Sequence, residues 1–203
     1  MVPMGSKTKI ILVDEAKDTG TLFFKDKTEK KGIIAFKKNN ILFKENENAE
    51  EIVYTFNEVY KLSVHNEKGE IDDYEYKLVI EENKTKVCLL QIRIIGKISL
   101  FITAINGRDP GMPMMSMNNG LVTTTFIGGG GAITLTRYFI SKENDLYATR
   151  IPIPNTRNYH FRKNIAPDFF SNCKDLMKKI NSKSFDTEDF EGLINYYNNK
   201  CQK

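Results

Sequence analysis

The sequence predicts an α+β protein in which an antiparallel β-sheet or barrel-like body over residues 8–155 is followed by a C-terminal helical hairpin within residues 156–203. Two observations carry this prediction. Between residues 20 and 105, short aromatic and β-branched segments alternate with turns of a few polar residues, and such short connections require antiparallel pairing. After His160 the apolar residues instead recur every three or four positions, which is the period of a helix.

The body is expected to contain about eight to ten strands. The most apolar strand, Lys86–Ile95, is expected at the centre of the sheet, and Gly96-Lys97 turns it into a hairpin with the next strand. Pro152 and Pro154 place the end of the last strand at a sheet edge, because proline cannot donate to the ladder. The expected strand segments are Thr21–Phe24, Gly32–Phe36, Ile41–Phe43, Val53–Phe56, Val59–Val64, Tyr74–Ile80, Lys86–Ile95, Ile98–Ile102, Leu121–Ile127, Ala132–Ile140 and Leu146–Ile153.

Residues 106–136 are expected to form a flexible loop region within this body. The Asn106–Gly120 part contains four of the seven methionines, two prolines and three glycines, and we do not expect it to form a regular strand or helix. Methionine is adaptable and common at contact surfaces. The segment therefore either packs locally against the body or provides a surface for a partner. The residues expected to contact such a partner are Met112, Met114, Met115, Met117, Phe126 and Ile127.

The run Gly128–Gly131 invites comparison with a phosphate-binding loop. Such a loop opens a helix and is usually followed by Lys-Ser/Thr. Here the next residues are Ala132-Ile-Thr-Leu-Thr136, which favour a strand. We therefore interpret the four glycines as a flexible hairpin connection.

No catalytic or metal-binding motif is present. The chain has two histidines, His65 and His160, and no Cys-x-x-Cys pair, which excludes the common zinc patterns, so no metal or cofactor is expected. Acidic pairs occur at Asp14-Glu15, Asp72-Asp73 and Glu81-Glu82, in segments that look like turns, where solvated carboxylates are the default. No catalytic residue is predicted.

Charge and hydropathy indicate which partners are not expected. Charged residues make up 28% of the chain and are mixed in sign, with a net charge of +4. Lys30-Lys31 and Lys37-Lys38 are only pairs, so no nucleic-acid partner is expected. Nor is a transmembrane helix expected, because no run of roughly 18 apolar residues occurs.

Residues 1–7 are expected to be a processed N-terminus or the remnant of an expression tag. Met4-Gly-Ser6 resembles such a remnant. The apolar run Ile10–Val13 is too short for the core of a signal peptide. We expect that a native leader has been removed.

Two helices are expected after His160. Pro167 fits the first turn of the first helix, where its missing N–H costs nothing. Asp186 is expected to cap the second, with Phe185 and Phe190 at the spacing of a hydrophobic staple. The first apolar stripe comprises Phe169, Phe170, Cys173, Leu176, Met177 and Ile180, and the second comprises Phe190, Leu193, Ile194, Tyr197 and Cys201.

Cys173 and Cys201 both lie on these stripes, whereas Cys88 is expected to be a small buried residue of the most apolar strand. In a simple helical hairpin Cys201 would be displaced along the helix by about 10 Å from the level of Cys173. A disulfide requires Cα atoms within about 7 Å. The bond therefore requires a helix break near Ser171-Asn172 or a steep crossing, and both the bonded and the free form remain open.

The segments Phe161–Ile180 and Asp189–Asn198, with Cys201, follow the pattern F-x-x-C-x-x-L-x-x-x-I…YN-x-x-C. This tail, together with Gly96–Leu100 and Tyr138–Lys142, resembles an uncharacterised family of exported, envelope-associated bacterial proteins with a β-rich body. The resemblance implies a non-enzymatic role and a periplasmic, outer-membrane-associated or secreted location after leader removal, with the cytoplasm as the alternative. It brings no catalytic residues.

The leading functional hypothesis is a binding or structural module of the cell envelope that contacts a protein, lipid or glycan. One alternative is a hydrolase with a noncontiguous site under the 106–136 region, marked by converging histidines or carboxylates. Another is a small-molecule carrier, which requires strands that close into a barrel with a roomy interior.

Overall fold

The computed structural model describes residues 18–37, 39–65, 69–81, 84–108, 112–118, 121–127, 132–152, 160–182 and 189–201, with the backbone alone described at 37, 104–108, 112–118, 121–127 and 132–135. The chain divides into two compact units. One comprises residues 1–11 and 104–136, and the other comprises residues 12–103 and 137–203.

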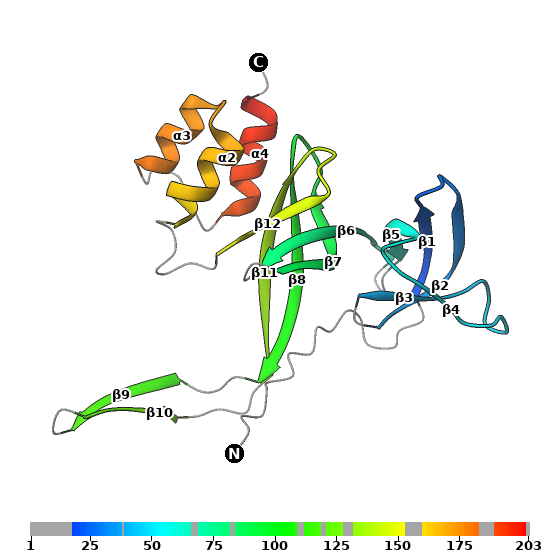
Figure 1. The fold of residues 1–203 in the computed structure, drawn as a ribbon, viewed down its shortest axis with the longest axis horizontal. Helices are drawn as coiled ribbons and strands as arrows, with labels where there is room; N and C mark the ends of the chain where they lie inside the picture. The colour runs from blue at the N-terminus through cyan, green and yellow to red at the C-terminus, as the bar shows by residue number, and fades with distance from the viewer. Residues whose placement is uncertain are drawn as a thin grey trace. The chain divides into compact units, whose positions relative to one another are not determined.

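Most described strands belong to one sheet, in the order β12-β11-β8-β7-β6-β5-β1-β2-β3-β4 (Figure 1). β12 also pairs with β6, in parallel, which places Tyr147 opposite Leu78 and Ala148 opposite Val79. This pairing closes β6, β7, β8, β11 and β12 into a five-stranded barrel, and the predicted α+β fold with a barrel-like body is confirmed. The strand bounds are β1 (Asp18–Phe24), β2 (Glu29–Lys37), β3 (Asn40–Lys44), β4 (Ile52–Tyr54), β5 (Val59–His65), β6 (Ile71–Glu81), β7 (Lys84–Ile94), β8 (Ile98–Arg108), β11 (Ala132–Lys142) and β12 (Tyr147–Ile151).

Strand β6 is shared by two hydrophobic cores, because successive side chains of a strand point to opposite faces. Tyr74 and Tyr76 belong to a core formed with β1–β5, whereas Val79 belongs to the core inside the barrel. The first core comprises Leu22, Phe24, Ile34, Ile41, Phe43, Tyr54, Val59, Leu62, Val64, Tyr74, Tyr76 and Leu89. The barrel core comprises Val79, Leu90, Phe101, Phe139 and Ala148.

The methionine-rich segment contains a strand, contrary to the expected loop. β9 (Met112–Asn118) pairs antiparallel with β10 (Leu121–Ile127) in a separate two-stranded sheet. The register places Pro113 opposite Phe126. A strand with only one partner tolerates proline, because the N–H on its outer side has no ladder bond to lose.

Two further expectations about strand neighbours are wrong. The strands that flank the glycine run do not form a hairpin with each other among the described residues, because β10 pairs with β9 and β11 pairs with β8 and β12. The glycines themselves lie outside the described residues. Nor is β12 an edge strand, since it lies between β11 and β6. It ends at Ile151, so the ladder does not need an N–H from Pro152.

The expected helical hairpin is divided into three helical segments. η1 (Phe161–Ile165), a π-helical turn, runs directly into α2 (Ala166–Phe170), and α3 (Lys174–Asn181) and α4 (Phe190–Lys200) follow. Pro167 lies in the first turn of α2, as predicted. The N-cap of α4 is Asp189, whose Oδ1 accepts a hydrogen bond of 2.8 Å from the Gly192 N–H, whereas Asp186 lies outside the described residues.

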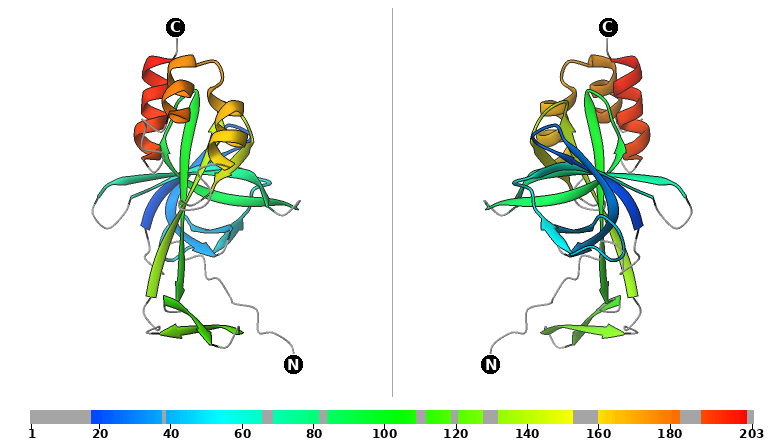
Figure 2. Two further views of the ribbon diagram at one scale, coloured as in Figure 1. Left: turned by 90° about the vertical axis from the view of Figure 1, so that its left-hand side faces the viewer. Right: turned by 90° about the vertical axis from the view of Figure 1, so that its right-hand side faces the viewer.

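The helices pack against the outer face of the barrel strands (Figures 1 and 2). The strands contribute side chains on the opposite face from the barrel core, so the sheet separates two apolar layers. This third core comprises Ile98, Leu100, Ile140, Ile151, Phe161, Ile165, Ala166, Phe170, Cys173, Leu176, Ile180, Phe190, Leu193, Ile194 and Tyr197.

Asn198 of α4 binds the β7–β8 turn through two backbone hydrogen bonds. Its Oδ1 accepts from the Ile98 N–H at 3.1 Å, and its Nδ2 donates to the Ile98 carbonyl at 2.8 Å. Gly96 makes room for the amide, since a Cβ at position 96 would lie 2.6 Å from the Asn198 Cγ. The Asn198 amide therefore pairs with the backbone of Ile98 as a neighbouring strand would, and this pairing joins the last helix to the barrel.

We expect Asn198→Ala to lower the free energy of unfolding by about 1–3 kcal/mol, because it leaves both backbone groups of Ile98 without a partner. Asn198→Asp is the matched variant: it keeps the acceptor and loses the donor. Urea unfolding should rank the proteins wild type, Asn198→Asp, Asn198→Ala in decreasing stability. Equal stability of all three would show that the amide does not dock the helix.

Candidate functional site

The barrel interior is filled by side chains. Val79, Leu90, Phe101, Phe139 and Ala148 are each at most 4% exposed and touch one another across the barrel. Cys88 and Ile92 are partly buried and pack against them. A roomy interior, on which the carrier hypothesis depends, is thus not found among the described residues of the barrel.

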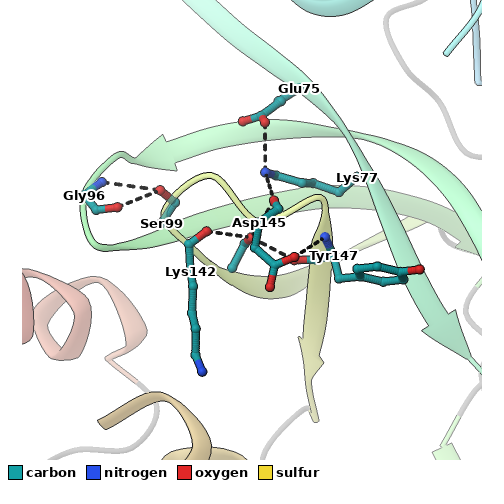
Figure 3. Close-up of polar contacts among 8 residues, drawn as sticks. Glu75, Lys77, Gly96, Ser99, Lys142, Asp145 and Tyr147 are labelled. Atoms are coloured by element: carbon teal, nitrogen blue, oxygen red, sulfur yellow. Dashed lines mark hydrogen bonds and ion pairs between the residues drawn. The ribbon is translucent and has the colours of Figure 1, made fainter. Parts of the chain in front are cut away.

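One end of the barrel is closed by the buried side chain of Lys77, which is 4% exposed (Figure 3). Its Nζ lies 2.8 Å from Glu75 Oε1, donates a hydrogen bond of 2.6 Å to the Asp145 carbonyl and lies 5.2 Å from the centre of the Phe101 ring. A buried ammonium is tolerated only with such partners.

Ser141 completes the same end of the barrel. This side chain is 1% exposed, and its hydroxyl lies 2.7 Å from the Tyr147 carbonyl that accepts its hydrogen bond. This hydrogen bond from the barrel interior stabilises the turn between β11 and β12. The Asp145 carboxylate stabilises the same turn by accepting a hydrogen bond of 3.0 Å from the Tyr147 N–H (Figure 3). These buried polar groups are hydrogen-bonded or paired with one another, which indicates a structural role for this end.

At the opposite end of the barrel, fewer of the hydrogen-bonding groups of the charged side chains have a partner among the described residues. We call Glu81, Lys86, Arg137 and Arg150 the Glu81 cluster. Lys86 Nζ lies 2.9 Å from Glu81 Oε2, whereas Arg150 Nη1 and Arg137 Nη1 lie 3.4 Å and 3.9 Å from Glu81 Oε1. One carboxylate thus faces three cations.

Strand alternation explains why these residues meet. Glu81 lies two positions after Val79 on β6, Arg150 two positions after Ala148 on β12, and Arg137 two positions before Phe139 on β11. Each therefore lies on the strand face that points into the barrel. Because β6 and β12 run parallel and β11 runs antiparallel to β12, the three side chains reach the same end.

The electrostatics of the cluster follow from this crowding. The hydrogen bond from Lys86 holds the pKa of the Glu81 carboxyl below its ordinary value, with the two arginines adding to the effect. Burial and the neighbouring charge of Arg150 lower the pKa of Arg137. Burial raises the pKa of the Cys88 thiol, and the Glu81 carboxylate adds to that rise.

The depressed pKa of Glu81 predicts an acid-dependent loss of stability. Because the folded-state value lies below the ordinary value of 4.5, the contribution of the carboxylate is present above pH 4.5 and is lost as pH falls through the folded-state pKa. Glu81→Gln should therefore be less stable than wild type at pH 6, and the difference should shrink with acidification. Urea unfolding between pH 2.5 and pH 6 measures it.

Glu191→Gln is the control for this prediction, because it removes an exposed ion pair with Arg93 at a similar distance of 3.4 Å. We expect that variant to change the free energy of unfolding by less than about 1 kcal/mol across the range. A constant gap between wild type and Glu81→Gln at every pH would contradict the assignment.

Cys173 and Cys201 form a disulfide with a Cα–Cα distance of 5.3 Å. The helix break that this bond requires is present, because α2 ends at Phe170 and α3 begins at Lys174. Tyr197 donates a hydrogen bond of 3.0 Å to Asn172 Oδ1, which joins the break to α4.

The structure places the other predicted residues as follows. The side chains of the six residues expected to contact a partner, Met112, Met114, Met115, Met117, Phe126 and Ile127, lie outside the described part of the structure. Asp72 and Asp73 lie within β6 and not in a turn; Asp73 forms an ion pair with Lys61 at 3.2 Å. Asp14-Glu15 and Glu82 lie outside the described residues.

The two histidines lie on different elements and are both exposed: His65 ends β5, and His160 precedes η1 with a ring nitrogen 2.8 Å from Asn164 Nδ2. Within the described ranges, no group of three or more His, Cys, Asp or Glu side chains is arranged to hold a metal ion. His65 also lines an open depression of about 460 Å³ on β1 and β2.

Comparison with known proteins finds no family model, no curated protein and no solved structure that matches this chain. Among the described helices, none is both long and apolar enough to cross a membrane.

Proposed function

We propose that the protein is a non-enzymatic binding module of the bacterial cell envelope. In this proposal the barrel and helices form a rigid scaffold, and the β9–β10 hairpin contacts a protein partner. The observation that carries the proposal is the Cys173–Cys201 disulfide. Structural disulfides persist in oxidising compartments such as the periplasm and the cell surface, and they are rare in the cytosol.

The hairpin is the element that we assign to partner binding. Among the described strands, β9 and β10 pair only with each other, and they are inserted in the chain between the paired strands β8 and β11. A two-stranded hairpin is marginally stable alone in water. A protein partner can supply both backbone pairing at a strand edge and apolar contact with methionine and phenylalanine side chains. This combination favours protein over lipid or glycan.

The compartment is tested by counting free thiols in cells that express the native gene. Cells are quenched in acid, denatured and treated with a thiol-reactive polymer before and after reduction. We expect one modified cysteine, Cys88, before reduction and all three after it. Three modified cysteines before reduction, in protein recovered with the cytosol, would overturn the envelope location.

The binding element is tested with two variants of the hairpin. In the first, the four methionines of β9 are changed to serine; in the matched control, Thr123, Thr124 and Thr125 of β10 are changed to serine. Each purified protein is crosslinked in an envelope extract, and the recovered partner is purified and rebound. A single stoichiometric partner should be lost with the methionine variant and kept with the threonine variant. Equal recovery by both variants would reject the hairpin as the contact.

A further inference from the structure

We propose that the Glu81 cluster at one end of the barrel binds a phosphate dianion, either free or as a phosphate monoester, through the guanidinium groups of Arg137 and Arg150. This site is separate from the hairpin assigned above and does not depend on it. All of its residues belong to the unit formed by residues 12–103 and 137–203.

The first support is charge. Lys86, Arg137 and Arg150 carry three positive charges around the single carboxylate of Glu81, so the cluster has an excess of two. The two arginine side chains are only 31% and 30% exposed. Partly buried cations gain from anionic partners because screening by water is reduced. A dianion balances the excess, whereas a carboxylate leaves one charge uncompensated.

The second support is the number of unused donors. A guanidinium has five N–H donors in a planar fork that matches two phosphate oxygens. Arg150 uses Nη1 in a long hydrogen bond of 3.4 Å to Glu81 Oε1, and Arg137 Nη1 approaches that same oxygen only to 3.9 Å. The Nε of Arg150 is buried and has no acceptor among the described residues. The protein therefore leaves much of this donor capacity available.

The third support is rigidity. Arg150 and Arg137 project from strands that pair with each other, and the register places Phe139 of the filled barrel core opposite Arg150. Both side chains thus start from a packed sheet and not from a loop. Sites on rigid elements lose less conformational entropy when a ligand binds. About a third of each side chain remains open to solvent, which leaves a route for a small anion.

Glu81 has a defined role in this proposal: it occupies the guanidinium groups when the ligand is absent and competes with it. Substitution of an arginine and substitution of Glu81 should therefore change the affinity for phosphate in opposite directions. Removing an arginine should weaken binding, whereas removing the carboxylate should strengthen it. A merely structural ion cluster predicts no change in phosphate affinity in either direction.

The experiment is a titration of the full-length protein at pH 8 with inorganic phosphate, methyl phosphate and dimethyl phosphate. At this pH a monoester is a dianion, because its second pKa is about 6, whereas a diester carries one charge. Calorimetry gives the affinity, and the Nε–H resonances of the arginines report the place. We expect the dianions to bind and to shift the Arg137 and Arg150 signals but not that of Arg93, whose ion pair with Glu191 lies elsewhere. The inorganic and methyl arms decide between free and esterified phosphate.

Three variants complete the test. Arg150→Gln should weaken binding at least about tenfold, as expected for loss of a charge-assisted hydrogen bond. Glu81→Gln should tighten it, and Arg93→Gln should leave it unchanged. Circular dichroism establishes that each variant is folded; if Arg150→Gln unfolds, Arg150→Lys, which keeps the charge and loses the fork, replaces it. No saturable binding by wild type, equal binding of dimethyl phosphate, or equal loss in Arg93→Gln would overturn the proposal.

Discussion

Loss of the Cys173–Cys201 bond should lower the free energy of unfolding by about 3.5 kcal/mol at 25 °C. This follows from the entropy that the crosslink removes from the unfolded chain for a separation of 28 residues. Cys173 also belongs to the core between the helices and the barrel, so the bond joins the end of α4 to that core. Urea unfolding of wild type with and without a reductant measures it.

Two cysteine variants separate the crosslink from other effects of reduction. The double variant Cys173→Ser with Cys201→Ser should match reduced wild type and should not respond to reductant. Cys88→Ser keeps the crosslink and should retain the response, because Cys88 is the free cysteine. If reduced and oxidised wild type unfold at the same urea concentration, the bond does not stabilise the helical part.

Phe101→Ala should be the most destabilising single substitution in the barrel, with a loss of about 3–5 kcal/mol. Phe101 is 1% exposed, and its ring lies among the side chains that fill the barrel. Its removal creates a cavity there and also takes away the aromatic face near the Lys77 ammonium. Thermal and urea unfolding give the magnitude.

Ile95→Ala is the matched control for Phe101→Ala. It also truncates an apolar side chain near the β7–β8 turn, but Ile95 is 69% exposed, and we expect a change within about 0.5 kcal/mol. If both variants lose the same small amount, the barrel is not held together by its interior.

Much of the strand pattern could be predicted, because local alternation and short turns are properties of neighbouring residues. Closure of the barrel could not. It depends on the parallel pairing of β12 with β6, whose paired residues Tyr147 and Leu78 are far apart in the chain. No local pattern records that pairing. The prolines after β12 pointed to an edge, yet the strand ends before them and has neighbours on both sides.

The methionine-rich segment carries two competing signals. Its glycines and prolines favour a loop, whereas the dipeptide Asn119-Gly120 favours a tight turn between two strands. This dipeptide is a strong indicator of a two-residue hairpin loop, and it separates the paired residues Asn118 and Leu121. The sequence therefore contained the signal for β9 and β10.

The helical tail shows how a single apolar stripe can hide a break. Phe170, Cys173 and Leu176 keep helical spacing, although the helix is interrupted between the first and the last of them. A disulfide between Cys173 and Cys201 requires such an interruption, because its Cα atoms must lie within about 7 Å. Asp189 is the N-cap of α4, because its Oδ1 accepts a hydrogen bond from the N–H of Gly192, three residues later.

The Glu81 cluster had no sequence signature. Its members come from four strands, and each appears in the sequence as an ordinary surface charge. As one of a pair of acids, Glu81 is expected in a turn, but it ends β6, and Val79 identifies the face of that strand that points into the barrel. Only the closed barrel brings Arg137 and Arg150 to the same carboxylate.

Because β6 has an apolar layer on each face, the lobe built from β1–β5 shares a strand of its core with the barrel. If those strands detached, Tyr74 and Tyr76 would be left facing water on a strand that still lined the barrel. The cost of that exposure couples the two lobes, so they should melt as one cooperative body. A fragment cut after His65 would therefore lack part of its own interior, and the remainder would be prone to self-association.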